Sequence, residues 1–162
     1  MAIATPSQDS HFVRQAIQTA LEHMKAGHGG PFGALVVRNN EIVGLGWNQV
    51  TSTHDPTAHA EIVAIRGAAA RLNSFALRGC TLYCSCEPCP MCLGAAYWAR
   101  LDRIVFAATR ADAAAAGFDD EELYLELSLP MAARRLPMQQ LLREEAAVVL
   151  EQWKTLPNKI AY

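Results

Sequence analysis

The feature that most constrains the fold is a set of potential metal-binding side chains divided between two distant segments. His59-Ala60-Glu61 forms the first segment, and Pro88-Cys89-Pro90-Met91-Cys92 forms the second. The two cysteines are three residues apart, so on a helix both sulfur atoms project from one face and reach the same ion. His59 lies at the start of a different predicted helix. The fold must therefore bring two helix N-termini to one point, where their partial positive ends favour thiolates.

These residue types in this arrangement indicate a catalytic zinc site. A catalytic zinc usually has three protein ligands and an open fourth position, whereas a structural zinc usually has four protein ligands. We expect His59, Cys89 and Cys92 to bind one Zn²⁺, which lowers the pKa of bound water from ~15.7 to about 7 and so provides hydroxide as the nucleophile. We expect Glu61 to be the catalytic residue that carries the water proton to the substrate.

A third cysteine, which could be a fourth ligand, allows a different interpretation of the same segments. Cys86, together with His59, Cys89 and Cys92, could form a closed structural site with three cysteines and one histidine. The chain would then be a binding module stabilised by zinc, and Glu61 would have no role. Retention of zinc in a Cys86→Ser variant distinguishes the open site from the closed one.

The composition is that of a globular protein with a small ligand. The 162 residues are 51% hydrophobic and 19% charged, which fits one domain over residues 1–162. A net charge of −2, with scattered Arg and Lys, provides little attraction for a phosphate backbone. No apolar run approaches the ~20 residues that cross a bilayer. We expect a cytoplasmic protein without a nucleic-acid or membrane partner, whose five cysteines remain reduced.

Hydrophobic periodicity predicts helices that alternate with strands after an opening helix and hairpin. Helices are expected over residues 9–26, 57–72 and 88–99, and a loop followed by a short helix over residues 113–128. Strands are expected at residues 33–38, 41–47, 80–84, 104–107 and 146–150, with a loop at residues 48–56. This order predicts an α/β protein with a mixed sheet and helices on both faces.

The pattern H-x-E followed by P-C-x-x-C is that of zinc-dependent nucleobase deaminases. Through it the chain resembles the cytidine-deaminase-like superfamily, and within it most resembles the bacterial guanine deaminases. The zinc motif is common to the superfamily, whereas Gly117-Phe118-Asp119-Asp120 and the terminal Tyr162 discriminate among its members. The resembling segments cover nearly the whole chain: 29–34, 48, 55–61, 85–95, 97–100, 116–120 and 158–162.

This resemblance implies a three-layer α/β/α sandwich with a five-stranded sheet, and hydrolysis of guanine to xanthine and ammonia. It also implies a homodimer in which the C-terminal segments are exchanged, so that each closes the partner's pocket and excludes bulk water. Asn48 and Asp120 are expected to bind the polar edges of the purine, and Phe32 and Trp98 to line its pocket. Tyr162 is expected to complete the pocket from the exchanged tail. The full set of implied substrate-binding residues is Asn48, Asp120, Phe32, Trp98, Tyr162 and Ala60.

Related substrates remain as alternatives at this point. They are cytosine, guanosine, an aminotriazine such as ammeline, and adenosine in tRNA. A tRNA substrate predicts a basic surface, which the composition does not offer. A nucleoside needs room for ribose, which a closing C-terminal tail would oppose.

Overall fold

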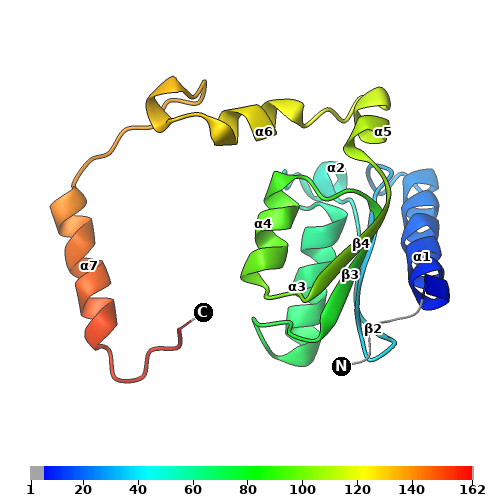
Figure 1. Ribbon diagram of the computed structural model, residues 1–162, viewed down its shortest axis with the longest axis horizontal. Helices are drawn as coiled ribbons and strands as arrows, with labels where there is room; N and C mark the ends of the chain where they lie inside the picture. The colour runs from blue at the N-terminus through cyan, green and yellow to red at the C-terminus, as the bar shows by residue number, and fades with distance from the viewer. Residues whose placement is uncertain (1–5, 162) are drawn as a thin grey trace. The chain divides into compact units, whose positions relative to one another are not determined.

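The computed structural model describes residues 6–161, and the chain divides into two compact units (Figure 1). The first unit ends at Asp120, and the second begins at Glu121. Tyr162, one of the expected substrate-binding residues, lies outside the described residues. All the other expected site residues belong to the first unit.

The first unit is built on a mixed sheet of four strands in the order β2-β1-β3-β4. β1 (Gly33–Arg38) pairs antiparallel with β2 (Glu41–Trp47) and with β3 (Cys80–Cys86), and β3 pairs parallel with β4 (Arg103–Ala108). Asn39 and Asn40 both have positive φ, which is the backbone of a two-residue hairpin turn. The hairpin is confirmed, but the expected fifth strand is absent from residues 6–161.

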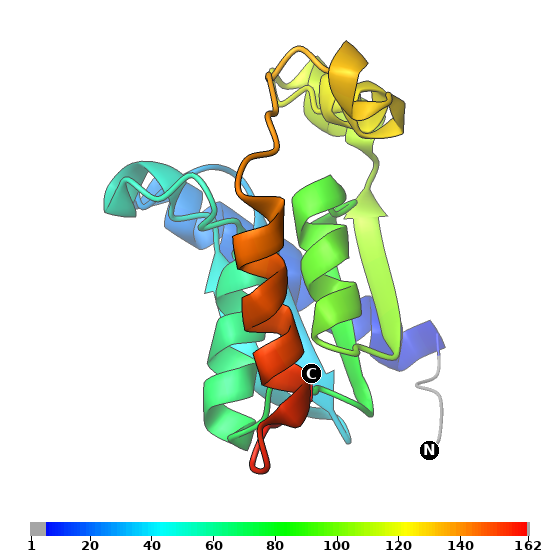
Figure 2. The same cartoon turned by 90° about the vertical axis from the view of Figure 1, so that its left-hand side faces the viewer.

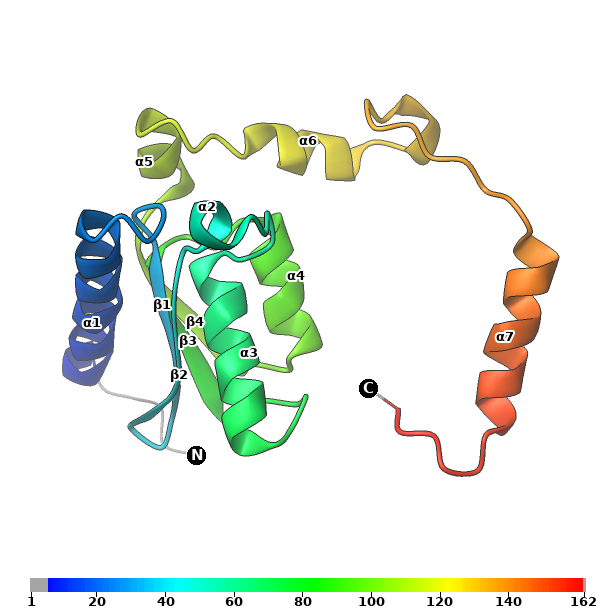
Figure 3. The same cartoon turned by 180° about the vertical axis from the view of Figure 1, so that it is seen from behind.

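Helices cover both faces of this sheet, which confirms the three-layer α/β/α arrangement (Figures 1 and 3). α1 (Pro6–Lys25) lies on one face, and α3 (Ala60–Leu72) and α4 (Pro90–Trp98) lie side by side on the other (Figure 2). Successive residues of β1 point to opposite layers. Ala34 and Val36 therefore belong to the core under α3, whereas Leu35 and Val37 belong to the core under α1.

Small residues allow α3 to lie directly on β2. A Cβ atom added to Gly46 would be 2.2 Å from the carbonyl oxygen of Ala60, and one added to Gly44 would be 2.2 Å from that of Ala64. Both glycines thus meet the backbone of α3, on which Ala60, Ala64 and Ala68 are buried. This contact fixes the first turn of α3, which carries the histidine and carboxylate of the predicted site.

Two short helices lie wholly (α2) or partly (α5) in segments expected as loops. α2 (Val50–Thr53) lies within the expected loop at residues 48–56. α5 (Arg110–Ala115) follows β4 and leads to the end of the first unit.

The second unit contains α6 (Glu121–Ser128), the 3₁₀ turn η1 (Met131–Ala133) and α7 (Arg143–Thr155). The strand expected at residues 146–150 is wrong, because these residues lie within α7. A short apolar run does not distinguish a strand from a helix, and Glu144 and Glu145 just before it favour a helix N-terminus. None of the residues of α6, η1 or α7 is buried. Among residues 6–161, no helix is long and apolar enough to span a membrane.

Candidate metal centre and substrate pocket

The three expected zinc ligands converge at the N-termini of two neighbouring helices. His59 is the N-cap residue of α3, and Cys89 is the N-cap residue of α4. Cys92 lies within the first turn of α4 and is buried. His59 Nδ1 lies 3.6 Å from Cys89 Sγ and 3.6 Å from Cys92 Sγ.

This geometry fits a tetrahedral zinc ion. Zn–N bonds of 2.0–2.1 Å and Zn–S bonds of about 2.3 Å, at a tetrahedral angle, separate the two donor atoms by about 3.6 Å. The potential donor atoms of His59, Cys89 and Cys92 all lie within 4.8 Å of one another. In the part of the chain that the structure describes, this is the one such group of three His, Cys, Asp or Glu residues. The donor set and its spacing therefore suit zinc.

Hydrogen bonds among the ligands favour a thiolate. The Cys92 thiol donates to the Cys89 sulfur, and with a further contribution from His59 this lowers the pKa of Cys89 to about 4. The same hydrogen bond raises the pKa of Cys92, and the contact with Cys89 raises the pKa of His59. Because the thiolate is the metal-binding form of cysteine, the lowered pKa of Cys89 favours binding of a cation.

Glu61 lies beside this ligand group in the first turn of α3. The residue is buried, with 8% of its surface exposed, and its carboxyl group interacts with the Cys92 thiol. Desolvation raises the pKa of Glu61 above its usual range. A carboxyl group with a raised pKa exchanges protons more readily near neutral pH, as a proton carrier must.

The other cysteines do not join the ligand group. The Cys86 sulfur lies 3.6 Å from the carbonyl oxygen of Thr109. Cys80 and Cys84 are buried in the core, as expected for structural thiols. The site therefore retains the composition of an open, catalytic one.

Asn48 is a buried residue whose orientation is fixed by backbone groups. Its Oδ1 atom accepts hydrogen bonds from the N–H groups of Gly30, at 3.2 Å, and Val50, at 3.3 Å. Gly29 has φ +155°, and a Cβ atom there would lie 1.8 Å from the Asn48 carbonyl oxygen, so this turn requires glycine. Since the side-chain oxygen is occupied, Asn48 can offer a ligand the two N–H donors of its amide.

Phe32 packs against the core that includes Ala60, and Asp120 is influenced by the charge of Cys89. The Phe32 ring packs edge-on against Phe118, with ring centroids 4.9 Å apart. The pKa of Asp120 is raised, first by desolvation and then by the charge of Cys89, which places its carboxyl group within electrostatic range of a zinc ligand. Phe118 was not among the expected site residues. Its sequence signal was its place in the segment Gly117-Phe118-Asp119-Asp120, in which Gly117 has φ +91°.

The remaining expected residues differ in their placement. Ala60 is buried directly after His59. Trp98 is the last residue of α4, roughly 9 Å along the helix axis from Cys92, and 65% of its surface is exposed. The Arg100 guanidinium lies 5.7 Å from the Trp98 ring centroid. Within one chain, Trp98 is therefore not brought to the ligand group.

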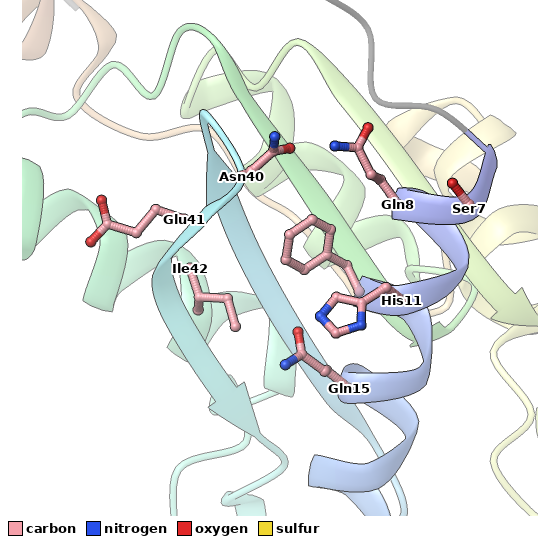
Figure 4. A pocket seen from close by; sticks show the side chains of 8 residues that line it. Ser7, Gln8, His11, Gln15, Asn40, Glu41 and Ile42 are labelled. Atoms are coloured by element: carbon pink, nitrogen blue, oxygen red, sulfur yellow. The ribbon is translucent and has the colours of Figure 1, made fainter.

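A separate groove of about 540 Å³ lies between the N-terminal half of α1 and the β1–β2 turn (Figure 4). The side chains of His11 and Gln15 extend over it, whereas Glu41 points away toward Arg71.

β1 begins near the metal centre, where the Gly33 N–H bonds to Ser85 Oγ, and ends at this turn. The groove therefore lies at the opposite end of the sheet, and it contains none of the expected site residues.

Comparison with known proteins agrees with this geometry. Residues 6–108 match the family described as the cytidine and deoxycytidylate deaminase zinc-binding region. The chain belongs to this family, which is a class of zinc-dependent deaminases.

Among its relatives is the guanine deaminase of Bacillus subtilis, which is 46% identical over 93% of this chain and 97% of its own length. A crystal structure of guanine deaminase from that organism superposes with a TM-score of 0.92, at 46% identity, over 94% of this chain and 98% of that one. A tRNA-specific adenosine deaminase of Buchnera aphidicola is 40% identical, but over 65% of this chain and 70% of its own length.

Proposed function

We propose that this protein hydrolyses guanine at C2, giving xanthine and ammonia. The zinc motif cannot select the base, because deaminases of different bases have it in common. The choice of guanine as the substrate rests on the extent of the similarity to a guanine deaminase, which spans 93% of the chain. This similarity therefore includes the segment with Phe118 and Asp120. The similarity to a tRNA-specific adenosine deaminase spans 65% of it.

His59, Cys89 and Cys92 would hold the zinc ion, which when bound lowers the pKa of a water molecule toward neutrality. The Glu61 carboxylate accepts one proton from the attacking water and transfers it to the ring nitrogen beside C2. It then accepts the second water proton, now on the C2 hydroxyl, and transfers it to the departing amino group. In sum, a C2–O bond forms, the C2–N bond breaks, and ammonia leaves. Burial of Glu61 supports this role, because it keeps the carboxyl group able to take up and release protons.

The polar groups of the pocket complement guanine. Asn48 offers N–H donors, which match acceptors such as O6, while the Asp120 carboxylate accepts from ring N–H groups. Phe32 and Phe118 provide aromatic surface next to these groups. Cytosine and an aminotriazine such as ammeline share part of this donor and acceptor pattern, and they are the substrates to compare with guanine.

We also propose a homodimer in which the C-terminal unit of each chain packs on its partner and Tyr162 completes the partner's pocket. Apolar side chains of this unit support the proposal, because among its described residues Leu125, Leu127, Val149 and Leu150 are each at least 60% exposed. Exposed apolar surface on this scale marks an interaction site. Such an enzyme would serve purine catabolism in the cytoplasm.

Ammonia release from the zinc-loaded protein tests the substrate. We expect release from guanine, much slower release from guanosine, cytosine, adenine and ammeline, and loss of activity with a chelator that is reversed by added Zn²⁺. Release from guanosine but not from guanine would overturn the choice of substrate. No release from any of the five would favour a zinc-stabilised binding module.

A further inference from the structure

The junction between β4 and α5 is hydrogen-bonded to Glu87, which lies two residues before Cys89. The Glu87 backbone N–H donates to the Ala108 carbonyl oxygen at 2.8 Å. The Arg110 backbone N–H donates to Glu87 Oε2 at 3.0 Å. Glu87 thus holds the start of α5 with both its backbone and its side chain, two residues before Cys89.

The side-chain bond is not needed to begin the helix. α5 has its own complete capping box, in which Thr109 Oγ1 accepts from the Asp112 N–H and Asp112 Oδ2 accepts from the Thr109 N–H. The Glu87 carboxylate comes from a different element. Its bond therefore determines where α5 begins relative to the metal ligands, rather than whether α5 forms.

The far end of α5 is equally well defined. The Phe118 N–H donates to the Ala113 carbonyl oxygen, and the Gly117 N–H donates to that of Ala114, each at 2.9 Å. These two bonds, with Gly117 at φ +91°, form a Schellman motif. A helix of six residues with both ends fixed is a rigid spacer between Glu87 and Phe118.

The segment after this spacer carries Phe118 and Asp120, which the proposed function places beside the substrate. The Phe118 ring contacts Phe32, and Asp120 lies within electrostatic range of Cys89. The charge of Arg110, whose backbone Glu87 binds, also acts on the Asp120 carboxyl group and lowers its pKa. The spacer thus begins at a hydrogen bond to Glu87, two residues before Cys89, and leads at its other end to the ring that contacts Phe32.

We infer that Glu87 is a positioning residue: by holding the Arg110 N–H, it sets the place of Phe118 and Asp120 and thereby the affinity for the purine. This inference rests on the proposed function, because it assigns Asp120 to the substrate. The role needs only an oxygen acceptor at Glu87, so glutamine satisfies it and alanine does not.

The test measures guanine binding and turnover in Glu87→Ala and Glu87→Gln. In a Glu61→Gln background, where turnover is blocked, Glu87→Ala should weaken the Kd for guanine about tenfold, and Glu87→Gln by less than about threefold. With Glu61 intact, Glu87→Ala should raise KM and change kcat little, as expected when binding is lost equally from ground and transition states. Glu41→Ala, which removes another surface carboxylate at the far end of the sheet, is the matched control and should change neither constant.

Zinc content and a crystal structure of Glu87→Ala provide readouts that do not depend on the substrate. We expect full zinc content and loss of the Phe32–Phe118 ring contact. An unchanged ring contact, an unchanged Kd, loss of zinc, or equal impairment by alanine and glutamine would each overturn the inference. Failure of the wild-type protein to deaminate guanine would instead contradict the proposed function, and the ring contact would still decide the role of Glu87.

Discussion

At the scale of single residues, burial determines what the polar groups of the pocket can do. Glu61 lies away from solvent, and desolvation raises the pKa of its carboxyl group. Asn48 is also buried, and two backbone N–H groups hold its oxygen, so its donors have a fixed direction. In the proposed function the Asn48 donors are thus oriented before a ligand arrives, which reduces the cost of binding.

Replacement of Glu61 by glutamine separates proton transfer from metal binding. Glutamine has nearly the same shape but cannot carry a proton, so turnover of guanine should fall by a factor of about 10² to 10⁴. Zinc should remain bound, because Glu61 is not one of the ligand group. Steady-state kinetics and metal analysis check both outcomes. Normal turnover in this variant would remove Glu61 from the mechanism, and Glu41→Gln is the control that should retain wild-type kinetics.

At the scale of elements, the position of α3 depends on glycines in β2. The sequence predicted both elements, because their apolar residues recur at clear intervals. It did not predict that Gly46 lies against the backbone of Ala60, because that contact depends on how a helix packs on a sheet. The contact between Phe32 and Phe118 was missed for the same reason, since it joins segments far apart in the chain. The grouping of His59, Cys89 and Cys92 was predicted because residue type and spacing are enough to define a candidate metal site.

Gly46→Ala tests whether the strand positions the site. Its added methyl group would lie 2.2 Å from the Ala60 carbonyl oxygen, so the first turn of α3 must move, and His59 and Glu61 with it. We expect weaker zinc retention during dialysis against a chelator, together with a loss of stability of about 1–3 kcal/mol. In the control Gly67→Ala, the nearest atom is 3.9 Å away, so zinc retention should not change and α3 should become slightly more stable. Equal zinc retention in the two variants would contradict this account.

An ion pair ties α1 to two strands of the sheet. Arg103 on β4 donates to both oxygens of Asp9, at 3.1 and 2.5 Å, and the Tyr83 hydroxyl of β3 donates to Asp9 Oδ1 at 2.8 Å. Asp9→Asn should cost about 1–3 kcal/mol at pH 7, because it removes the charge that these donors bind.

The pH dependence of this cost follows from the pKa of Asp9, which the Arg103 hydrogen bonds hold below its ordinary value of 3.8. The contribution of a carboxyl group with a lowered pKa is complete above the unfolded-state value and is lost as the pH falls through the folded-state value. The difference in unfolding free energy between wild type and Asp9→Asn should therefore be constant above roughly pH 5 and shrink toward pH 3. Urea denaturation at several pH values checks this, and a difference that grows at low pH would contradict it.

At the scale of the whole molecule, the C-terminal unit has an apolar surface that its own described residues do not cover. We propose above that a second copy covers it and receives Tyr162 in its pocket. Removal of residues 158–162 should then abolish turnover without abolishing dimer formation, which light scattering can verify. This variant retains Glu61 but lacks the tail, whereas full-length Glu61→Gln retains the tail but lacks the proton carrier.

If the tail acts on the partner, these two inactive proteins should complement each other. In a dimer with one chain of each kind, the site with an intact Glu61 receives the intact tail of the other chain. Refolding an equal mixture should therefore restore roughly a quarter of the wild-type activity, since half of the dimers are mixed and each has one complete site. Simple mixing of the folded proteins, the control, should restore activity only as slowly as the chains exchange. If the tail instead closed the site of its own chain, neither protein would contain a complete site, and the refolded mixture would remain inactive.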